Sequence, residues 1–139
     1  MKVVINRCFG GFGLSDMAIE MIMKRKGLDC YRYEYKFKND GEDYIRVDGF
    51  SSNLGLGNYY STADLGKKVD KIPDENFWYY GRLDRTDEDM IAVIEEIGEE
   101  AASGKFSELS IVEIPDDVNW ELDEYDGIET IHEVHRTWC

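Results

Sequence analysis

The pattern of apolar and polar residues predicts a mixture of strands and helices, beginning with a strand. Residues 2–8 form a short apolar run typical of a buried strand. Residues 31–37 alternate Tyr or Phe with charged residues, which is the period of a half-buried strand. Asn39-Asp40-Gly41 then offers a turn, and residues 44–47 a return strand. The first half of the chain therefore predicts a buried strand and a hairpin.

A first helix is predicted directly after the glycine-rich segment at residues 10–13. Ser15 is a good N-cap, because its hydroxyl can accept a hydrogen bond from an amide of the first turn. The basic residues 24–26 suit the negative end of the helix dipole, and Gly27 can adopt the left-handed conformation that ends a helix. We therefore expect a helix that begins at Ser15 and stops at Gly27.

A second helix is predicted in the second half of the chain. Thr86 followed by Asp89 resembles a capping box with Asp in place of Glu, and Gly104 would end the helix. Its spacing of apolar residues gives one continuous buried face. That face comprises Met90, Ile91, Ile94, Ile97 and Ala101.

The remaining segments carry weaker patterns. Residues 50–60 are rich in Gly, Ser and Asn and predict a long loop, residues 61–70 a short helix, and residues 77–80 a short strand. Residues 109–114 predict a strand that stops at a proline.

Asp126-Gly127 is the strongest hairpin signal in the chain, with residues 118–125 and 128–134 as its two strands. The full order is strand, helix, hairpin, long loop, helix, strand, hairpin. This order predicts one α+β domain over residues 1–139, with a mostly antiparallel sheet and two helices packed on one face.

The acidic residues are concentrated in the second half. From Asp84 to Cys139 there are 18 Asp and Glu against 3 Lys and Arg, a net of −15, whereas residues 1–83 have 12 acids against 13 bases, a net of +1. Such a segment repels nucleic acid and anionic lipid and attracts cations or basic protein surfaces. We therefore expect a basic protein partner, and neither duplex nucleic acid nor membrane.

Two further features bear on location. No apolar run approaches the ~20 residues that a membrane helix needs. Three scattered cysteines, Cys8, Cys30 and Cys139, are typical of reduced thiols in a cytosol. The sequence gives no indication of the oligomeric state.

The glycine-rich loop is the first candidate binding site. Glycines let backbone amides approach an anion, and a helix N-terminus adds partial positive charge, so a nucleotide-like ligand is one interpretation. The spacing matches neither a Rossmann nor a Walker fingerprint, and a tight packing turn, with Phe9 and Phe12 in the core, is the interpretation that we favour. The candidate residues are Gly10, Gly11, Phe12, Gly13 and Ser15.

The last hairpin gives the second candidate. A two-residue turn places Glu121 opposite His132, with Asp123 on the diagonal, so this acidic cluster surrounds an imidazole. Acid–base catalysis is one interpretation, and a solvated cross-strand ion pair is the one that we favour. We expect no catalytic residue, no cofactor and no bound metal. Further ligand-binding candidates close to His132 are His135, Arg136 and Trp138.

Cys8-Phe9-Gly10-Gly11-Phe12-Gly13-Leu14-Ser15 and the stretch from 112 to 138, which ends in His-Arg-Thr-Trp, resemble a family of small uncharacterised proteins from bacteriophages and bacterial mobile elements. The resemblance covers most of the chain. It implies a phage-type accessory protein in the bacterial host cytoplasm, and it implies no particular activity.

We therefore expect a non-enzymatic accessory binding protein that interferes with a host or defence function. It would cover a basic surface with its acidic face or sequester a nucleotide-like ligand. The alternatives are a small enzyme acting on a phosphorylated substrate through His132 with Glu121 and Asp123, and a structural phage component.

Overall fold

The computed structural model describes residues 1–38, 41–47 and 58–134. As predicted, the protein has an α+β fold, and the paired strands of the described residues are all antiparallel. Within this described part, no helix combines the length and the apolar character needed to cross a membrane. The packing of two helices on one sheet face stays a prediction.

The chain divides into two compact units, which we treat separately. The acidic unit comprises Met1–Ile22 and Leu83–Cys139, and the sheet unit comprises Met23–Arg82. This division does not test the prediction of a single domain. It does coincide with the charge pattern, because Met1–Ile22 has two Lys and Arg against two Asp and Glu, which leaves the acidic unit at −15 and the sheet unit at +1.

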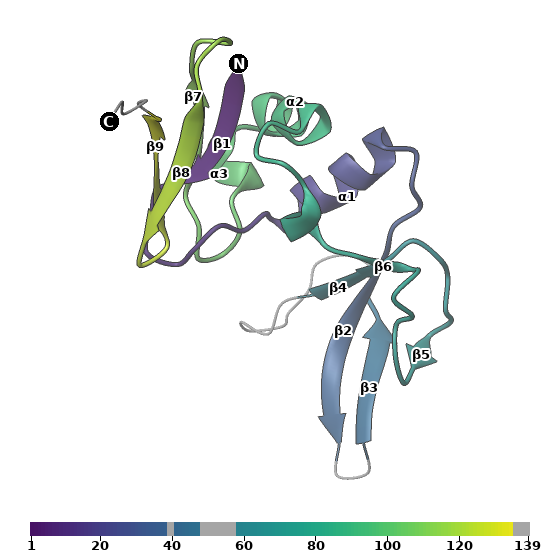
Figure 1. Ribbon diagram of the computed structural model, residues 1–139. Coiled ribbons are helices and arrows are strands. Elements are labelled where there is room, and N and C mark those ends of the chain that lie inside the picture. The colour runs from purple at the N-terminus through teal and green to yellow at the C-terminus, as the bar shows by residue number, and fades with distance from the viewer. Residues whose placement is uncertain (39–40, 48–57, 135–139) are drawn as a thin grey trace. The chain divides into compact units, whose positions relative to one another are not determined.

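Among its described residues, the acidic unit contains two antiparallel strand pairs, β1 with β7 and β8 with β9, and three helices, of which α1 follows β1 and α2 and α3 precede β7 (Figure 1). Its apolar strand β1 is buried from Val3 to Ile5, and Leu109 of its partner β7 is buried too. The elements are β1 (Lys2–Asn6), α1 (Asp16–Arg25, which runs into the sheet unit), α2 (Glu88–Ile97), α3 (Glu99–Ala102), β7 (Leu109–Glu113), β8 (Trp120–Tyr125) and β9 (Ile128–Glu133).

Helix α1 has the ends that its sequence predicts. The Ser15 hydroxyl accepts a hydrogen bond from the Ala18 amide at 3.2 Å, as an N-cap does. Gly27 has φ +77° and donates its amide to the Lys24 carbonyl at 3.0 Å. Positive φ is available to glycine without steric cost, so the helix ends there.

Both predicted ends of the second helix are wrong. The N-cap is Asp87 rather than Thr86, because the Asp87 carboxylate accepts a hydrogen bond from the Met90 amide at 2.9 Å. A carboxylate is a stronger acceptor than a hydroxyl at the positive end of a helix. The helix ends at Gly98, with φ +93°, and not at Gly104.

The break at Gly98 also changes the buried face. Met90 and Ile94 are buried as predicted, and Val93 joins them. Ala101 is exposed, whereas Ala102 is buried, because α3 starts a new helical turn with its own orientation. The predicted continuous stripe therefore stops at the end of α2.

The sheet unit is built on one five-stranded antiparallel sheet, with strand order β5-β3-β2-β4-β6 (Figure 1). The predicted hairpin of β2 and β3 is confirmed, although its turn at residues 39–40 lies outside the described residues. The elements are β2 (Tyr31–Lys38), β3 (Gly41–Arg46), β4 (Asn58–Ser61), β5 (Lys68–Val69), β6 (Phe77–Trp78) and the 3₁₀ turn Tyr80–Arg82.

The predicted helix at residues 61–70 is wrong. The buried Tyr33 hydroxyl donates to the Gly66 carbonyl at 2.9 Å and accepts from the Leu65 amide at 3.0 Å, so residues 62–67 form a loop between β4 and β5. Asp64 accepts from the Gly66 amide and pairs with Arg46, both at 2.9 Å. These contacts, the amide first, hold the pKa of Asp64 below its usual range.

The predicted loop at 50–60 is also too long at its end. Residues 58–60 belong to β4, which pairs with β2, while residues 48–57 lie outside the described part of the chain. The predicted strand at 77–80 is shorter, since β6 covers Phe77–Trp78 only.

Candidate functional site

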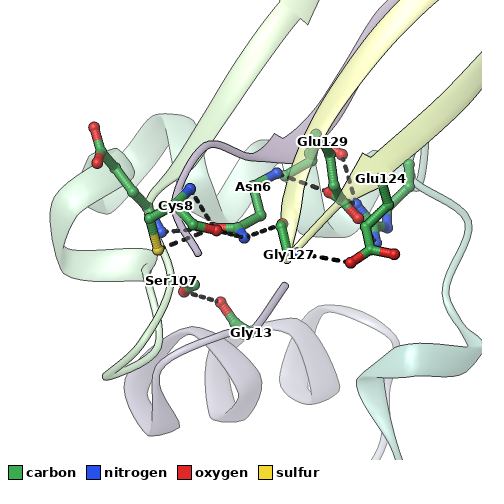
Figure 2. A network of polar contacts seen from close by, with 10 residues as sticks. Asn6, Cys8, Gly13, Ser107, Glu124, Gly127 and Glu129 are labelled. Carbon is green, nitrogen blue, oxygen red and sulfur yellow. Dashed lines mark hydrogen bonds and ion pairs between the residues drawn. The ribbon is translucent and has the colours of Figure 1, made fainter. Parts of the chain in front are cut away.

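Asn6, the last residue of β1, connects three segments of the acidic unit. Its side chain is fully buried, and Nδ2 donates to the carbonyl oxygens of Cys8 and Gly127, each at 2.7 Å (Figure 2). Its Oδ1 accepts from the Glu108 amide at 2.8 Å. One amide side chain therefore holds the start of the glycine-rich loop, the turn before β7 and the turn of the β8–β9 hairpin together.

The glycine-rich loop lies directly against these two turns. A Cβ on Gly10 would collide with the carbonyl oxygen and the Cβ of Phe106. A Cβ on Gly127 would lie 2.5 Å from the carbonyl oxygen of Phe9, closer than real Cβ atoms come. Both glycines are needed because backbones approach each other here without room for a side chain.

The N-terminus of α1 faces carbonyl oxygens. Ser15 donates its amide to the Ala102 carbonyl at 2.9 Å and its hydroxyl to the Ala101 carbonyl at 2.8 Å. The Gly13 carbonyl accepts from the Ser107 hydroxyl at 2.7 Å (Figure 2). These oxygens carry partial negative charge at the place where an anion would bind, and they favour the packing interpretation of the loop.

The ligand-binding role of the loop stays a prediction. Of its residues, Gly11 has φ +87° and open space around its Cβ position. The candidates brought together here are Gly10, Gly11, Phe12, Gly13 and Ser15.

An ion pair beside Asn6, between the buried Glu129 and the half-buried Arg85, completes the polar network. Arg85 donates Nη1 and Nη2 to the two Glu129 oxygens at 2.5 and 2.7 Å. Glu129, 5% exposed, also accepts from the Asn6 amide at 2.8 Å (Figure 2). The Arg85 guanidinium lies 3.6 Å from the centroid of the Phe12 ring. The backbone carbonyl of Arg85 accepts a hydrogen bond from the Val4 amide at 2.8 Å. Arg85 thus contacts the Phe12 ring as well as β1.

The acidic cluster has the predicted register. Glu121 is paired with His132 across the β8–β9 hairpin, whose turn residues Asp126 and Gly127 both have positive φ. His132 Nε2 lies 3.0 Å from Glu121 Oε1, and His132 Nδ1 lies 2.8 Å from Asp123 Oδ2. Each ring nitrogen therefore faces one carboxylate.

This cluster is open to water. The side chains of His132, Glu121 and Asp123 are 44%, 57% and 63% exposed. Exposed pairs of this kind contribute at most about 1 kcal/mol, and water weakens the fields that catalysis needs. The arrangement is that of a solvated, hydrogen-bonded surface cluster.

The same three side chains form the one group among the described residues that is close enough to share a metal ion. Their ligand atoms all lie within 4.8 Å of one another. Imidazole nitrogen and carboxylate oxygen are ligands of zinc and of other divalent metals. The remaining C-terminal candidates, His135, Arg136 and Trp138, lie outside the described residues.

Acid is exposed over much of the acidic unit. Of the 18 Asp and Glu residues from Asp84 onward, 15 are exposed, two are half-buried and Glu129 is buried. Among the described residues from Asp84 onward, Lys105 is the one exposed base. Arg85 is half-buried, and its charge is paired with Glu129. This surface is consequently dominated by negative charge.

Three aromatic side chains stand out from this acidic surface. Phe9, Phe106 and Tyr125 are 71%, 63% and 75% exposed. The prediction that Phe9 lies in the core is therefore wrong, because the backbones packed around the loop leave its ring outside. Sequence reasoning missed Phe106 and the network residues Asn6, Arg85 and Glu129. Asn6 alone gives a signal in the sequence, as a polar residue at the end of an apolar run, whereas the pattern around the other three residues gives none.

Comparison of the chain with known protein families, with curated proteins and with solved structures gives no match.

Proposed function

We propose that this protein is a non-enzymatic, phage-type accessory protein that binds a basic surface of a bacterial host protein and so blocks a host or defence function. The observation that carries the proposal is the set of 15 exposed acids beyond residue 83. The phage context and the bacterial cytoplasm rest on the resemblance of the two terminal motifs.

The charge distribution supports binding to a protein rather than to nucleic acid. A surface of one sign attracts a complementary surface over several ångströms and raises the rate of encounter. The same field repels phosphate backbones, which need Lys and Arg to neutralise them. A basic surface that normally binds nucleic acid is the kind of partner that this charge fits.

The nucleotide-sequestering alternative is less well supported. It needs amides free to hold phosphate at the glycine-rich loop, where Ser15 donates instead to the carbonyls of Ala101 and Ala102. The enzymatic alternative rests on the contacts of His132, which are open to water. The Ser15 contacts therefore do not favour nucleotide binding, and the His132 contacts do not favour catalysis, over binding by the acidic surface.

The test compares two variants that lose the same number of charges. The first neutralises four exposed acids of the acidic unit, and the second neutralises four exposed acids of the sheet unit. The first carries Glu96→Gln, Glu113→Gln, Asp117→Asn and Glu133→Gln, and the second carries Asp29→Asn, Asp70→Asn, Asp74→Asn and Glu75→Gln.

Partners are recovered from infected bacteria with the tagged protein, identified and purified, and the association rate is measured at several salt concentrations. We expect the first variant to associate about tenfold more slowly at low salt, and the second to differ less than about twofold. An association rate that ignores both salt and the first set of substitutions would refute the proposed function.

A further inference from the structure

We propose that Phe9, Phe106 and Tyr125, which we call the aromatic site, bind arginine side chains of the basic partner. This inference rests on the proposed function and names the residues that would give it specificity. The three rings are 71%, 63% and 75% exposed and all belong to the acidic unit.

Exposed aromatic rings of this size are costly to leave in water. Aromatic residues that become buried in an interface commonly supply most of its binding energy, whereas surrounding charges contribute mainly to encounter. A basic partner held by carboxylates alone would bind weakly and would be released by salt. The aromatic site therefore supplies what the acidic surface lacks.

The segments that carry the three rings are held together by the buried network. The Asn6 side chain binds the carbonyl oxygens of Cys8 and Gly127 (Figure 2). Cys8 directly precedes Phe9, and Gly127 follows Tyr125 by two residues. The Cys8 thiol donates to the Phe106 carbonyl at 3.0 Å. Because the backbone is fixed before binding, little entropy is lost when a partner docks.

The surroundings of the rings favour a cation as the ligand. Exposed carboxylates lie within two residues of Phe106 and Tyr125 in the sequence, at Glu108, Glu124 and Asp126, whereas the exposed charged residue closest in sequence to Phe9 is Arg7. Inside the same unit, rings already accept cations, since Lys105 Nζ lies 5.4 Å from the centroid of Phe106 and the half-buried Arg85 guanidinium lies over Phe12. Phe106 nevertheless keeps most of its surface exposed.

Arginine fits this combination better than lysine. A guanidinium is flat and weakly hydrated, so it can stack on an aromatic face while its N–H groups bind a neighbouring carboxylate. A lysine ammonium is compact and strongly hydrated, and it loses more hydration on the same ring. The aromatic site should therefore prefer arginine at equal charge.

The experiment uses two fluorescent peptides of equal length and charge, one with arginine and one with lysine separated by serine and glycine. Fluorescence anisotropy measures their binding to the full chain. We expect the arginine peptide to bind about threefold to tenfold more tightly. Replacing the three aromatic residues together by Leu keeps apolar surface but should abolish this preference. Replacing Tyr79, an exposed tyrosine of the sheet unit, by Leu is the control and should leave it unchanged.

The outcomes separate this inference from the proposed function. Equal binding of both peptides, with no change in the Leu variant, would overturn the aromatic site while leaving the acidic surface intact. Failure of wild type to bind either peptide at low salt would refute both. Because the rings are exposed, the Leu variant should retain the wild-type circular dichroism spectrum.

Discussion

Replacement of Asn6 by Ala tests whether one buried amide holds the glycine-rich loop in place. Asn6 makes three hydrogen bonds of 2.7 to 2.8 Å through its side chain, to Cys8, Gly127 and Glu108. Alanine removes all three, together with the longer hydrogen bond of 3.4 Å from the Cys8 amide, and leaves two carbonyl oxygens and two amides without these partners. The substitution adds no bulk, so the effect reports the lost hydrogen bonds.

The expected loss of stability follows from these contacts. A hydrogen bond contributes about 1 kcal/mol net, so three give about 3 kcal/mol, a large part of the total stability of a small protein. With a urea dependence of about 2 kcal/mol per molar, the midpoint should fall by about 1.5 M. The melting temperature should fall by roughly 10 °C.

The assay is urea and thermal unfolding followed by far-UV circular dichroism. Asn119→Ala is the matched control, because Asn119 is exposed, and it should change stability by less than about 0.5 kcal/mol. Hydrogen exchange adds a local measurement: the Glu108 amide, which donates to Asn6, should exchange faster in Asn6→Ala. If Asn6→Ala were as stable as the control, the loop would be held by other contacts and the reasoning would be wrong.

Three further predictions address other contacts. Glu129→Leu should lower the free energy of unfolding by about 3–5 kcal/mol because Arg85 loses its partner, and the double variant Arg85→Met/Glu129→Leu should lower it by less. Urea unfolding measures both, and a larger loss in the double variant would contradict this reasoning. Gly127→Ala should lower the melting temperature more than Gly98→Ala, because both glycines have positive φ but only a Cβ at Gly127 would collide with the loop backbone. An equal decrease in melting temperature for the two variants would count against close packing at Gly127. Asp64→Asn should destabilise the protein at about pH 6 and have little effect at about pH 2, because the lowered folded-state pKa of Asp64 gives stability that is lost as pH falls through that pKa. Urea unfolding at both pH values tests this, and an equal loss of stability at both would show that the Asp64 charge does not contribute.

Local signals predicted the ends of α1 and the register of the last hairpin. A two-residue turn at Asp126-Gly127 leaves one way to pair the strands, so the sequence alone places Glu121 and His132 opposite each other. Ser15 and Gly27 likewise act through neighbours in the chain. Interactions of this kind are readable because the partners are close in sequence.

The features that failed depend on partners far apart in the chain. Glu129 looks like one more acid in an alternating strand, but it is buried against Arg85, 44 residues earlier. Residues 61–66 have a pattern compatible with helix, yet the Tyr33 hydroxyl binds their backbone from another strand. Asn6 is similar, because its role depends on Glu108 and Gly127. Tertiary contacts overrode local preference at each of these places.

The contacts along β1 have a consequence for the solubility of the chain. One edge of β1 pairs with β7, and on the other edge the Val4 amide donates to the Arg85 carbonyl and the Asn6 amide to Glu129. An apolar strand with a free edge is a template for intermolecular pairing and amyloid growth. Here two amides of that edge are already bonded within the molecule, and one of them ends on a carboxylate. Loss of Glu129 would therefore free the Asn6 amide at the end of this edge as well as destabilise the fold.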